Sequence, residues 1–384
     1  MGTLTEFDKL RKKRRIKRAF KRTTWLMILA VLAAGGFLLW SLASYLDFDS
    51  RLSNYLSSMR PGQGFPIPLD DMDVIQLTPM GNDVAVVTRS GNYIYNANGA
   101  RLYTCLSTYS HPVTKSSGGK LLTYDAGGQE VKITTKTDLL YTLERPGKVF
   151  AADICGTGAF AIAESSKGSL GVVTAYSAKN EEMYRWETTQ GYIYQLSLNG
   201  KGTLFSAATV NADNGTLVSR IHFHHFSATD QVAVVELPDE LILSMVWNSD
   251  GRLQVITDRR LHVYDQSGTE LFVGDTPEGL TYFENSPEGV LYLASGDSQS
   301  IGGVTVTGYD STLRQLGSWN SIRKVFSMQY YADRLLILTD GKLYLSDKNL
   351  SQVKERSVSG LTAVCGVGSS LYGINAEGLI HTGL

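Results

Sequence analysis

Cysteine is scarce in this sequence. Its three cysteines, Cys105, Cys155 and Cys365, lie far apart, and none belongs to a CxxC pair. An odd number of cysteines scattered through apolar segments does not form a disulfide framework. We therefore expect three small buried side chains, and one incidental disulfide remains open as an alternative.

Motifs of several enzyme classes are missing as well. No G-x-S-x-G nucleophile elbow is present, and no glycine-rich loop ends in Gly-Lys-Ser/Thr ahead of a helix. The sequence therefore predicts a protein that is not an enzyme, with no catalytic residues and no cofactor.

Acidic residues are rare at the start of the chain, and basic residues are concentrated there. Ten of the 36 basic residues and two of the 37 acidic ones lie in residues 1–22, so this segment has a net charge of +8 and the rest has −9. An acidic body argues against a nucleic-acid partner, since phosphate binding needs Lys and Arg. The basic tail, residues 1–23, is typical of a cytoplasmic flank, with a nucleic-acid-binding arm as the alternative.

Charge is absent from residues 24–46, TWLMILAVLAAGGFLLWSLASYL. About 20 apolar residues are enough to cross a bilayer as a helix, so this run predicts one transmembrane helix. The basic flank places the N-terminus in the cytoplasm and the rest outside. Ser41-Leu42-Ala43 resembles a cleavage site, so cleavage after Ala43 is the alternative. However, the apolar run is longer than the roughly 7–15 residues of a signal peptide, which favours an uncleaved anchor.

Residues 47–63 are predicted to form a juxtamembrane stalk. Leu52, Tyr55, Leu56 and Met59 follow helical spacing and form one apolar face, and Pro61-Gly62 ends the helix. The remaining domain, residues 64–384, begins with the extended segment FPIPLD.

Long amphipathic helices are absent after Met72, where short runs rich in Val, Ile, Leu, Tyr and Thr alternate with turn residues. Four turn dipeptides separate such runs: Asn199-Gly200, Asn214-Gly215, Asp250-Gly251 and Asp340-Gly341. Runs and breaks of this kind predict an all-β domain built from hairpins.

The β-runs repeat along the chain. An apolar residue before a polar turn recurs about every 42 residues, at Tyr95, Ile133, Tyr176, Phe226, Tyr264, Tyr309 and Leu345. A period of roughly 40–45 residues with four strands per unit is typical of a β-propeller. One further step reaches His381, in a last unit with room for three strands. We expect FPIPLD to supply the missing strand and close the ring, which gives eight blades. Seven blades is the alternative, if the irregular unit at residues 109–147 merges with a neighbour.

Histidine provides the sharpest local feature. His222 and His224 share one face of a predicted strand, a spacing that occurs among metal ligands, and His262 is the best third candidate. A solvated outer strand with polar residues on one face is the favoured interpretation, so no metal site is predicted.

The basic tail, the spanning helix, GFPIPL, LLTYDAGG and EEMYRW resemble an uncharacterised family of single-pass membrane proteins from Gram-positive bacteria with a propeller-like ectodomain. The resemblance implies a cell-surface location and this fold, and it brings no known activity. The repeats are more distantly similar to quinoprotein-like and WD40-like propellers, although only Trp186 and Trp319 fit the tryptophan signature of the former.

We therefore expect a membrane-anchored extracytoplasmic β-propeller that acts as a non-catalytic interaction or scaffold module of the cell envelope. Its expected partners are the membrane, through one span, and an envelope protein or a cell-wall polymer. The alternative is a ligand-binding or enzymatic propeller with a site in the central channel, where residues from several blades meet without leaving a sequence motif.

Overall fold

The computed structural model of the chain describes Trp25, Met27, Gly35 and the ranges 56–69, 73–228, 230–296, 303–356 and 360–383. The chain divides into two compact units, Met1–Leu56 and Ser57–Leu384. The predicted tail lies outside the described residues, and so does the predicted spanning helix except for Trp25, Met27 and Gly35, which are helical. Among the residues described, no helix combines the length and apolar character that crossing a membrane requires.

The end of the predicted stalk helix is described. Residues 56–58 are helical, and the helix stops before Pro61, as predicted. The side-chain amide of Asn96 donates to the carbonyl oxygens of Ser57 and Arg60, at 3.1 and 2.8 Å. Residues 57–60 are therefore held against the turn that contains Asn96.

The described residues form 31 β-strands in eight antiparallel sheets, seven with four strands and one with three. Blades 1 to 4 comprise β1 (Val74–Met80), β2 (Asp83–Thr88), β3 (Gly91–Tyr95), β4 (Arg101–Leu106); β5 (Pro112–Ser117), β6 (Lys120–Asp125), β7 (Glu130–Thr134), β8 (Leu139–Glu144); β9 (Val149–Ile154), β10 (Phe160–Glu164), β11 (Gly171–Tyr176), β12 (Glu182–Thr188); and β13 (Tyr192–Leu198), β14 (Leu204–Asp213), β15 (Thr216–His225), β16 (Ala233–Pro238). Blades 5 to 8 comprise β17 (Ile242–Trp247), β18 (Leu253–Thr257), β19 (Arg260–Tyr264), β20 (Glu270–Asp275); β21 (Leu280–Asn285), β22 (Leu291–Ser295), β23 (Val304–Tyr309), β24 (Gln315–Ser321); β25 (Val325–Tyr331), β26 (Arg334–Thr339), β27 (Lys342–Asp347), β28 (Val353–Arg356); and β29 (Ala363–Val367), β30 (Ser370–Asn375), β31 (Gly378–Gly383).

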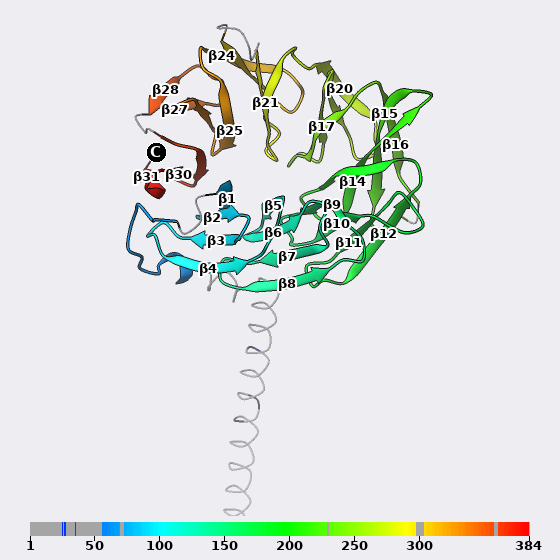
Figure 1. Cartoon of the computed structure of the whole chain (residues 1–384). Helices are drawn as coiled ribbons and strands as arrows, with labels where there is room; N and C mark the ends of the chain where they lie inside the picture. The colour runs from blue at the N-terminus through cyan, green and yellow to red at the C-terminus, as the bar shows by residue number, and fades with distance from the viewer. Residues whose placement is uncertain are drawn as a thin grey trace, which may run out of the picture. The chain divides into compact units, whose positions relative to one another are not determined.

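Within the second unit, the blades are arranged in a ring, and the first strand of each blade lies innermost, nearest the axis of the ring (Figure 1). The turns between strands one and two and between strands three and four share one face of the ring, which we call the turn face. The loops between strands two and three and between successive blades share the opposite face, the loop face. Asn96 follows the third strand of blade 1, so residues 57–60 join the ring at its turn face.

The hydrophobic core consists of eight clusters, one at each interface between neighbouring blades. Because each blade is covered on both sides, its middle strands are apolar on both faces. All six residues of β2 and all six of β11 are buried. This explains why the middle strands appear in the sequence as continuous apolar runs rather than alternating ones.

The predicted eight-bladed propeller is confirmed. Each of the seven repeat residues lies in the third strand of blades 1 to 7 or directly after it, and His381 lies in the third strand of blade 8. The alternative of seven blades is wrong, because residues 109–147 contain the complete sheet β5–β8. Trp186 and Trp319 lie in the outer strands β12 and β24.

Closure of the ring through FPIPLD is also confirmed. Ile67 forms an antiparallel bridge with Leu379 on β31, the outermost strand of the three-stranded blade. Phe65 packs on the rings of Tyr372 and His381 at centroid distances of 6.0 and 4.9 Å. The edge of β31 is thereby covered by the beginning of the same domain.

The four turn dipeptides all lie in turns, of two kinds. Asn214-Gly215 and Asp340-Gly341 are two-residue hairpin loops, and in the former both residues have positive φ, at 51° and 84°. The other two lie inside longer turns that begin at Asn199 and Asn248. The side-chain oxygen of each of these asparagines accepts hydrogen bonds from backbone N–H groups four residues along the chain.

Hydrogen bonds also join the inner strands of neighbouring blades. Among the described residues, in five cases a side chain of one inner strand accepts from a backbone N–H of the next: Asp153 from Leu198 at 2.8 Å, Tyr194 from Ile242 at 3.1 Å, Ser197 from Trp247 at 3.2 Å, Glu284 from Tyr330 at 3.2 Å and Gln329 from Gly366 at 2.7 Å. The polar groups of these buried strands are thus satisfied between blades.

The three cysteines are buried and unpaired, which confirms the expectation of small buried side chains and leaves the incidental disulfide without support.

Candidate functional site

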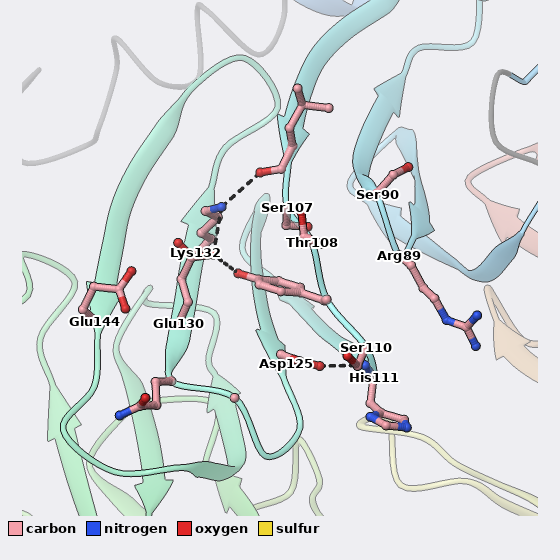
Figure 2. A pocket seen from close by; sticks show the side chains of 14 residues that line it. Arg89, Ser90, Ser107, Thr108, Ser110, His111, Asp125, Glu130, Lys132 and Glu144 are labelled. Carbon is pink, nitrogen blue, oxygen red and sulfur yellow. Dashed lines mark hydrogen bonds and ion pairs between the residues drawn. The ribbon is translucent and has the colours of Figure 1, made fainter.

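An open groove of about 1240 Å³ lies on the loop face between blades 1 and 2 (Figure 2). Loops of both blades and the connection from β4 to β5 form its walls. Its lining residues are Arg89, Ser90, Leu106, Ser107, Thr108, Tyr109, Ser110, His111, Asp125, Gly128, Gln129, Glu130, Lys132 and Glu144.

The connection between β4 and β5 is fixed to the neighbouring loop of blade 1. The backbone N–H groups of Ser107 and Tyr109 donate to the carbonyl oxygens of Ser90 and Arg89, both at 3.1 Å. Thr108 and Ser110 are exposed on this segment. The groove therefore presents hydroxyl groups on a well-anchored backbone.

A compact polar cluster forms one wall of the groove. The Lys132 ammonium lies 2.9 Å from Glu130 Oε1 and donates to the carbonyl oxygen of Leu106 at 3.0 Å. The Tyr109 hydroxyl donates to the same Glu130 oxygen at 2.7 Å, and Lys132 lies 5.7 Å from the centre of the Tyr109 ring. Figure 2 shows these groups converging from β7 and from the connection.

The cluster fixes the charges of its members. Burial raises the pKa of Glu130, but the hydrogen bonds from Lys132 and Tyr109 outweigh it, and the net shift is downward. Burial and the hydrogen bond to Glu130 both raise the pKa of Tyr109. At neutral pH Glu130 is therefore anionic and Tyr109 is neutral.

Glu144 adds a second carboxylate to this wall. It lies directly opposite Glu130 in the pairing of β7 with β8, and its side chain is exposed. Like charges in directly opposed positions repel each other, and Lys132 compensates the charge of Glu130. The groove wall therefore carries an accessible negative charge at Glu144.

The opposite rim carries both basic and acidic residues and is partly apolar. Arg89 and Asp73 form an exposed ion pair at 3.0 Å, which solvent and salt screen. The backbone N–H of His111 donates to Asp125 Oδ1 at 2.6 Å. Leu106 is 67% exposed at the edge of the groove. With its charges, hydroxyl groups and one exposed leucine, the groove has the chemistry of recognition of a polar polymer or polypeptide.

A smaller cavity of about 300 Å³ lies in the central channel. It is lined by residues of five inner strands, β5, β9, β13, β17 and β21, together with Tyr124 of β6: Val113, Lys115, Tyr124, Ala151, Ala152, Tyr194, Gln195, Leu196, Leu243, Ser244, Met245, Val246 and Phe283. The lining includes one lysine and no carboxylate or histidine. The converging acid–base groups that would favour an enzymatic channel are therefore not among these lining residues.

The three histidines named as weak metal candidates are buried in two blades. His222 and His224 lie on β15 and pack against Trp186 at ring distances of 4.7 and 4.5 Å. The interpretation as a solvated outer strand is wrong for them, because β15 is a middle strand covered by the outer strand β16 and by the neighbouring blade.

Other side chains engage most of the histidine nitrogens, whereas His224 Nε2 is buried without a hydrogen-bond partner. His222 Nε2 lies 2.9 Å from Thr209 Oγ1, and His224 Nδ1 lies 3.0 Å from the Tyr184 hydroxyl. His262, on β19, lies between Glu240 and Glu270, at 3.0 and 2.6 Å. In the part of the chain that the structure describes, no three or more His, Cys, Asp or Glu side chains are grouped so that they could hold a metal ion.

Sequence analysis did not identify the groove. Its residues come from four segments between residues 89 and 144, and none of these segments contains a motif. The available signal was the hydroxyl-rich stretch Ser107–Thr108–Tyr109–Ser110 at a junction between two repeats.

Residues 68–276, which extend from before blade 1 to the end of blade 5, match the model of a family of unknown function, DUF5711. No curated protein matches the sequence. Among solved structures, the chain is similar to BamB from Moraxella catarrhalis, with 14% identity over 82% of this chain and 97% of that one and a TM-score of 0.52. It is also similar to the C-terminal WD40 domain of Sif2, with 12% identity over 84% of this chain and 99% of that one and a TM-score of 0.55. At such identities these likenesses support the propeller fold alone.

Proposed function

The chain belongs to the DUF5711 family of unknown function, and from this starting point we propose that it is a membrane-anchored extracytoplasmic β-propeller that acts as a non-catalytic interaction or scaffold module of the cell envelope. The observation that carries the proposal is the open groove between blades 1 and 2, with an accessible carboxylate at Glu144 and an exposed Leu106. Such a surface is better suited to binding a partner than to catalysing a reaction.

The position of the groove agrees with an N-terminal anchor. Residues 57–60 join the ring at the turn face, and the groove opens on the loop face. The chain therefore enters the ring at the face opposite to the groove. The basic tail would remain in the cytoplasm, and the groove would be open to other envelope components.

The preferred partner is an envelope protein that presents an extended segment with a basic and an apolar side chain. Glu144 would pair with the basic residue, and Leu106 would contact the apolar one. The net negative charge of the chain beyond residue 22 favours a basic partner and predicts that binding weakens as salt increases. A cell-wall polymer is the other candidate, since the hydroxyl groups of Thr108 and Ser110 suit a polar chain.

The test is a crosslinking pull-down of the full-length chain from its native membrane. The double variant Leu106→Asn/Glu144→Lys should lose the captured envelope proteins, whereas Glu181→Lys, an exposed substitution on the turn face, should retain them. Replacing residues 1–55 with an unrelated anchor should also leave capture intact. Loss of capture in that chimera would place recognition in the N-terminal segment and would overturn the proposal.

A further inference from the structure

The cavity in the central channel is a second candidate site, separate from the groove. Most of its lining residues are apolar, including Ala151, Leu196, Met245 and Phe283 from four different inner strands, while polar atoms contribute nearly half of the exposed wall. Its volume of about 300 Å³ lies at the lower end of the range for small-molecule sites, roughly 300–1,000 Å³. This space suits a short aliphatic chain.

The polar groups of the cavity wall are already paired, with one exception. The Gln195 amide donates to the carbonyl oxygen of Leu243 at 2.8 Å, and the Tyr194 hydroxyl accepts from the Ile242 N–H at 3.1 Å. Ser244 accepts from Asn285 at 3.5 Å. Within the described parts of the chain, Lys115 forms no hydrogen bond or ion pair.

Lys115 has one acidic neighbour, Asp153 on the adjacent inner strand β9. Asp153 Oδ2 already accepts the N–H of Leu198 at 2.8 Å, one of the hydrogen bonds that join the blades. Burial raises the pKa of Asp153, and the charge of Lys115 acts in the opposite direction. The Asp153 carboxylate therefore lies within electrostatic range of Lys115, while its Oδ2 atom is hydrogen-bonded to Leu198 on the neighbouring inner strand.

Backbone bulges help to shape this cavity. In β13 and β17 the pairing with the second strand shifts register, so that Tyr194 and Leu243 are extra residues in their strands. Both side chains line the cavity. Bulges of this kind redirect side chains and are frequent next to binding sites.

We propose that the channel cavity binds a small aliphatic carboxylate, whose hydrocarbon chain packs on the apolar walls and whose carboxylate accepts hydrogen bonds from Lys115. A ligand with one negative charge and an apolar body matches this cavity, since among the described lining residues most are apolar and Lys115 is the one cation. Lys115 is exposed, so it can accept a ligand from solvent, and a charge-assisted hydrogen bond is among the stronger polar contacts in proteins.

The probe is octanoate, titrated calorimetrically into the full-length chain in lipid nanodiscs, with the heat from empty nanodiscs subtracted. Lys115→Met should weaken octanoate binding by about tenfold to a hundredfold, since hydrogen bonds to charged groups contribute roughly 1.5–3 kcal/mol. Asp153→Asn should strengthen it, because it removes the competing negative charge and keeps an acceptor for Leu198. The control Lys201→Met, on the turn face, should bind as wild type.

Three results would overturn the proposal: no binding above empty nanodiscs, equal affinity for octanoate and octanol, or unchanged affinity in Lys115→Met. Binding of an apolar peptide with a free C-terminus but not of octanoate would also overturn it, in favour of a protein ligand. Thermal unfolding of Lys115→Met must match wild type, and Lys115→Arg should retain binding if the charge matters. The groove variant Glu144→Lys should bind octanoate normally, which separates this site from the proposed interaction surface.

Discussion

Ile67 and Leu379 exchange two backbone hydrogen bonds, of 2.8 and 2.9 Å, and thereby join the first segment of the propeller to its last strand. Beside this bridge, the buried cluster between blades 8 and 1 includes Leu77, Val84, Tyr372 and Leu379. The ring is thus closed both by hydrogen bonds at its edge and by apolar packing within it.

Gly378→Ala should open this closure. Gly378 has φ of +115°, and a Cβ atom at this position would collide with the carbonyl oxygen of Ile67. We expect the free energy of unfolding to fall by about 1–3 kcal/mol, with faster amide exchange in β31. Gly383→Ala is the matched control, because it lies on the same strand and its Cβ would have no neighbour within 4 Å. Equal effects of the two substitutions would contradict the role assigned to the bridge.

The buried ion pair between blades 1 and 2 gives a second prediction. Lys136 Nζ lies 2.5 Å from Asp83 Oδ2, and the two side chains are 7% and 1% exposed. Lys136→Met leaves a buried carboxylate without its cation and should cost about 3–5 kcal/mol, measured by chemical denaturation. Replacing both partners, as Lys136→Met/Asp83→Asn, should recover much of that loss.

The exposed pair of Arg185 and Glu187 is the control for that measurement. It has the same chemistry at 3.0 Å, but both side chains are 48% exposed. Arg185→Met should cost less than about 1 kcal/mol. If Lys136→Met cost no more than Arg185→Met, the burial argument would be refuted.

Glu284 should make stability depend on pH. Burial raises its pKa to about 7, the hydrogen bond from the Tyr330 N–H acts downward, and the nearby Glu288 raises it further. A carboxyl group whose pKa is higher in the folded chain binds protons more tightly there. The free energy of unfolding should therefore decrease as pH rises from about 4.5 to about 7, by up to about 3 kcal/mol.

Glu284→Gln should remove this dependence, because the amide oxygen still accepts from Tyr330 while the group no longer ionises. Thermal unfolding at pH 5 and pH 8 measures the effect, and the variant should be the more stable chain at pH 8. A wild-type stability that increases over this interval, with no change in Glu284→Gln, would refute the assignment.

Zinc should not stabilise the protein. Burial lowers the pKa of His222 to about 4 and that of His224 to about 3, so both are neutral. Thr209 engages His222 Nε2 and Tyr184 engages His224 Nδ1, and among the described residues neither histidine belongs to a group of three or more possible metal ligands. A molar excess of Zn²⁺, or a chelator, should leave the melting temperature unchanged. An increase that disappears in His222→Gln would restore the metal hypothesis.

The propeller could be predicted from the sequence because its signals are local and repeated. The residues from Tyr95 to Leu345 precede polar turns at the same point of each blade, and this regularity survives insertions such as the long β14–β15 hairpin. The closing strand was predictable because the last unit lacks one strand and FPIPLD has no other partner. The turns that begin at Asn199 and Asn248 could not be predicted in detail. Hydrogen bonds to the asparagine side chains form these turns, and dipeptide patterns do not reveal such bonds.

The candidate sites could not be predicted, for a different physical reason. Glu144 and Leu106 lie on the outer strands of separate blades, and Lys115 meets residues of four other blades in the channel. These residues come together only because the blades are arranged in a closed ring. The burial of His222 depends in the same way on the neighbouring blade, so a polar alternation within one strand was misleading.

The hydrogen bonds that a backbone N–H of one inner strand donates to a side chain of a neighbouring one share a direction along the chain. In each of the five described pairs, from Asp153 with Leu198 to Gln329 with Gly366, the accepting side chain belongs to the earlier blade and the donating N–H to the later one. During synthesis, each of these acceptors leaves the ribosome before its donor. We therefore expect each blade to dock on the blade synthesised before it, in N-to-C order, while the bridge between Ile67 and Leu379 completes the ring only after β31 has been synthesised.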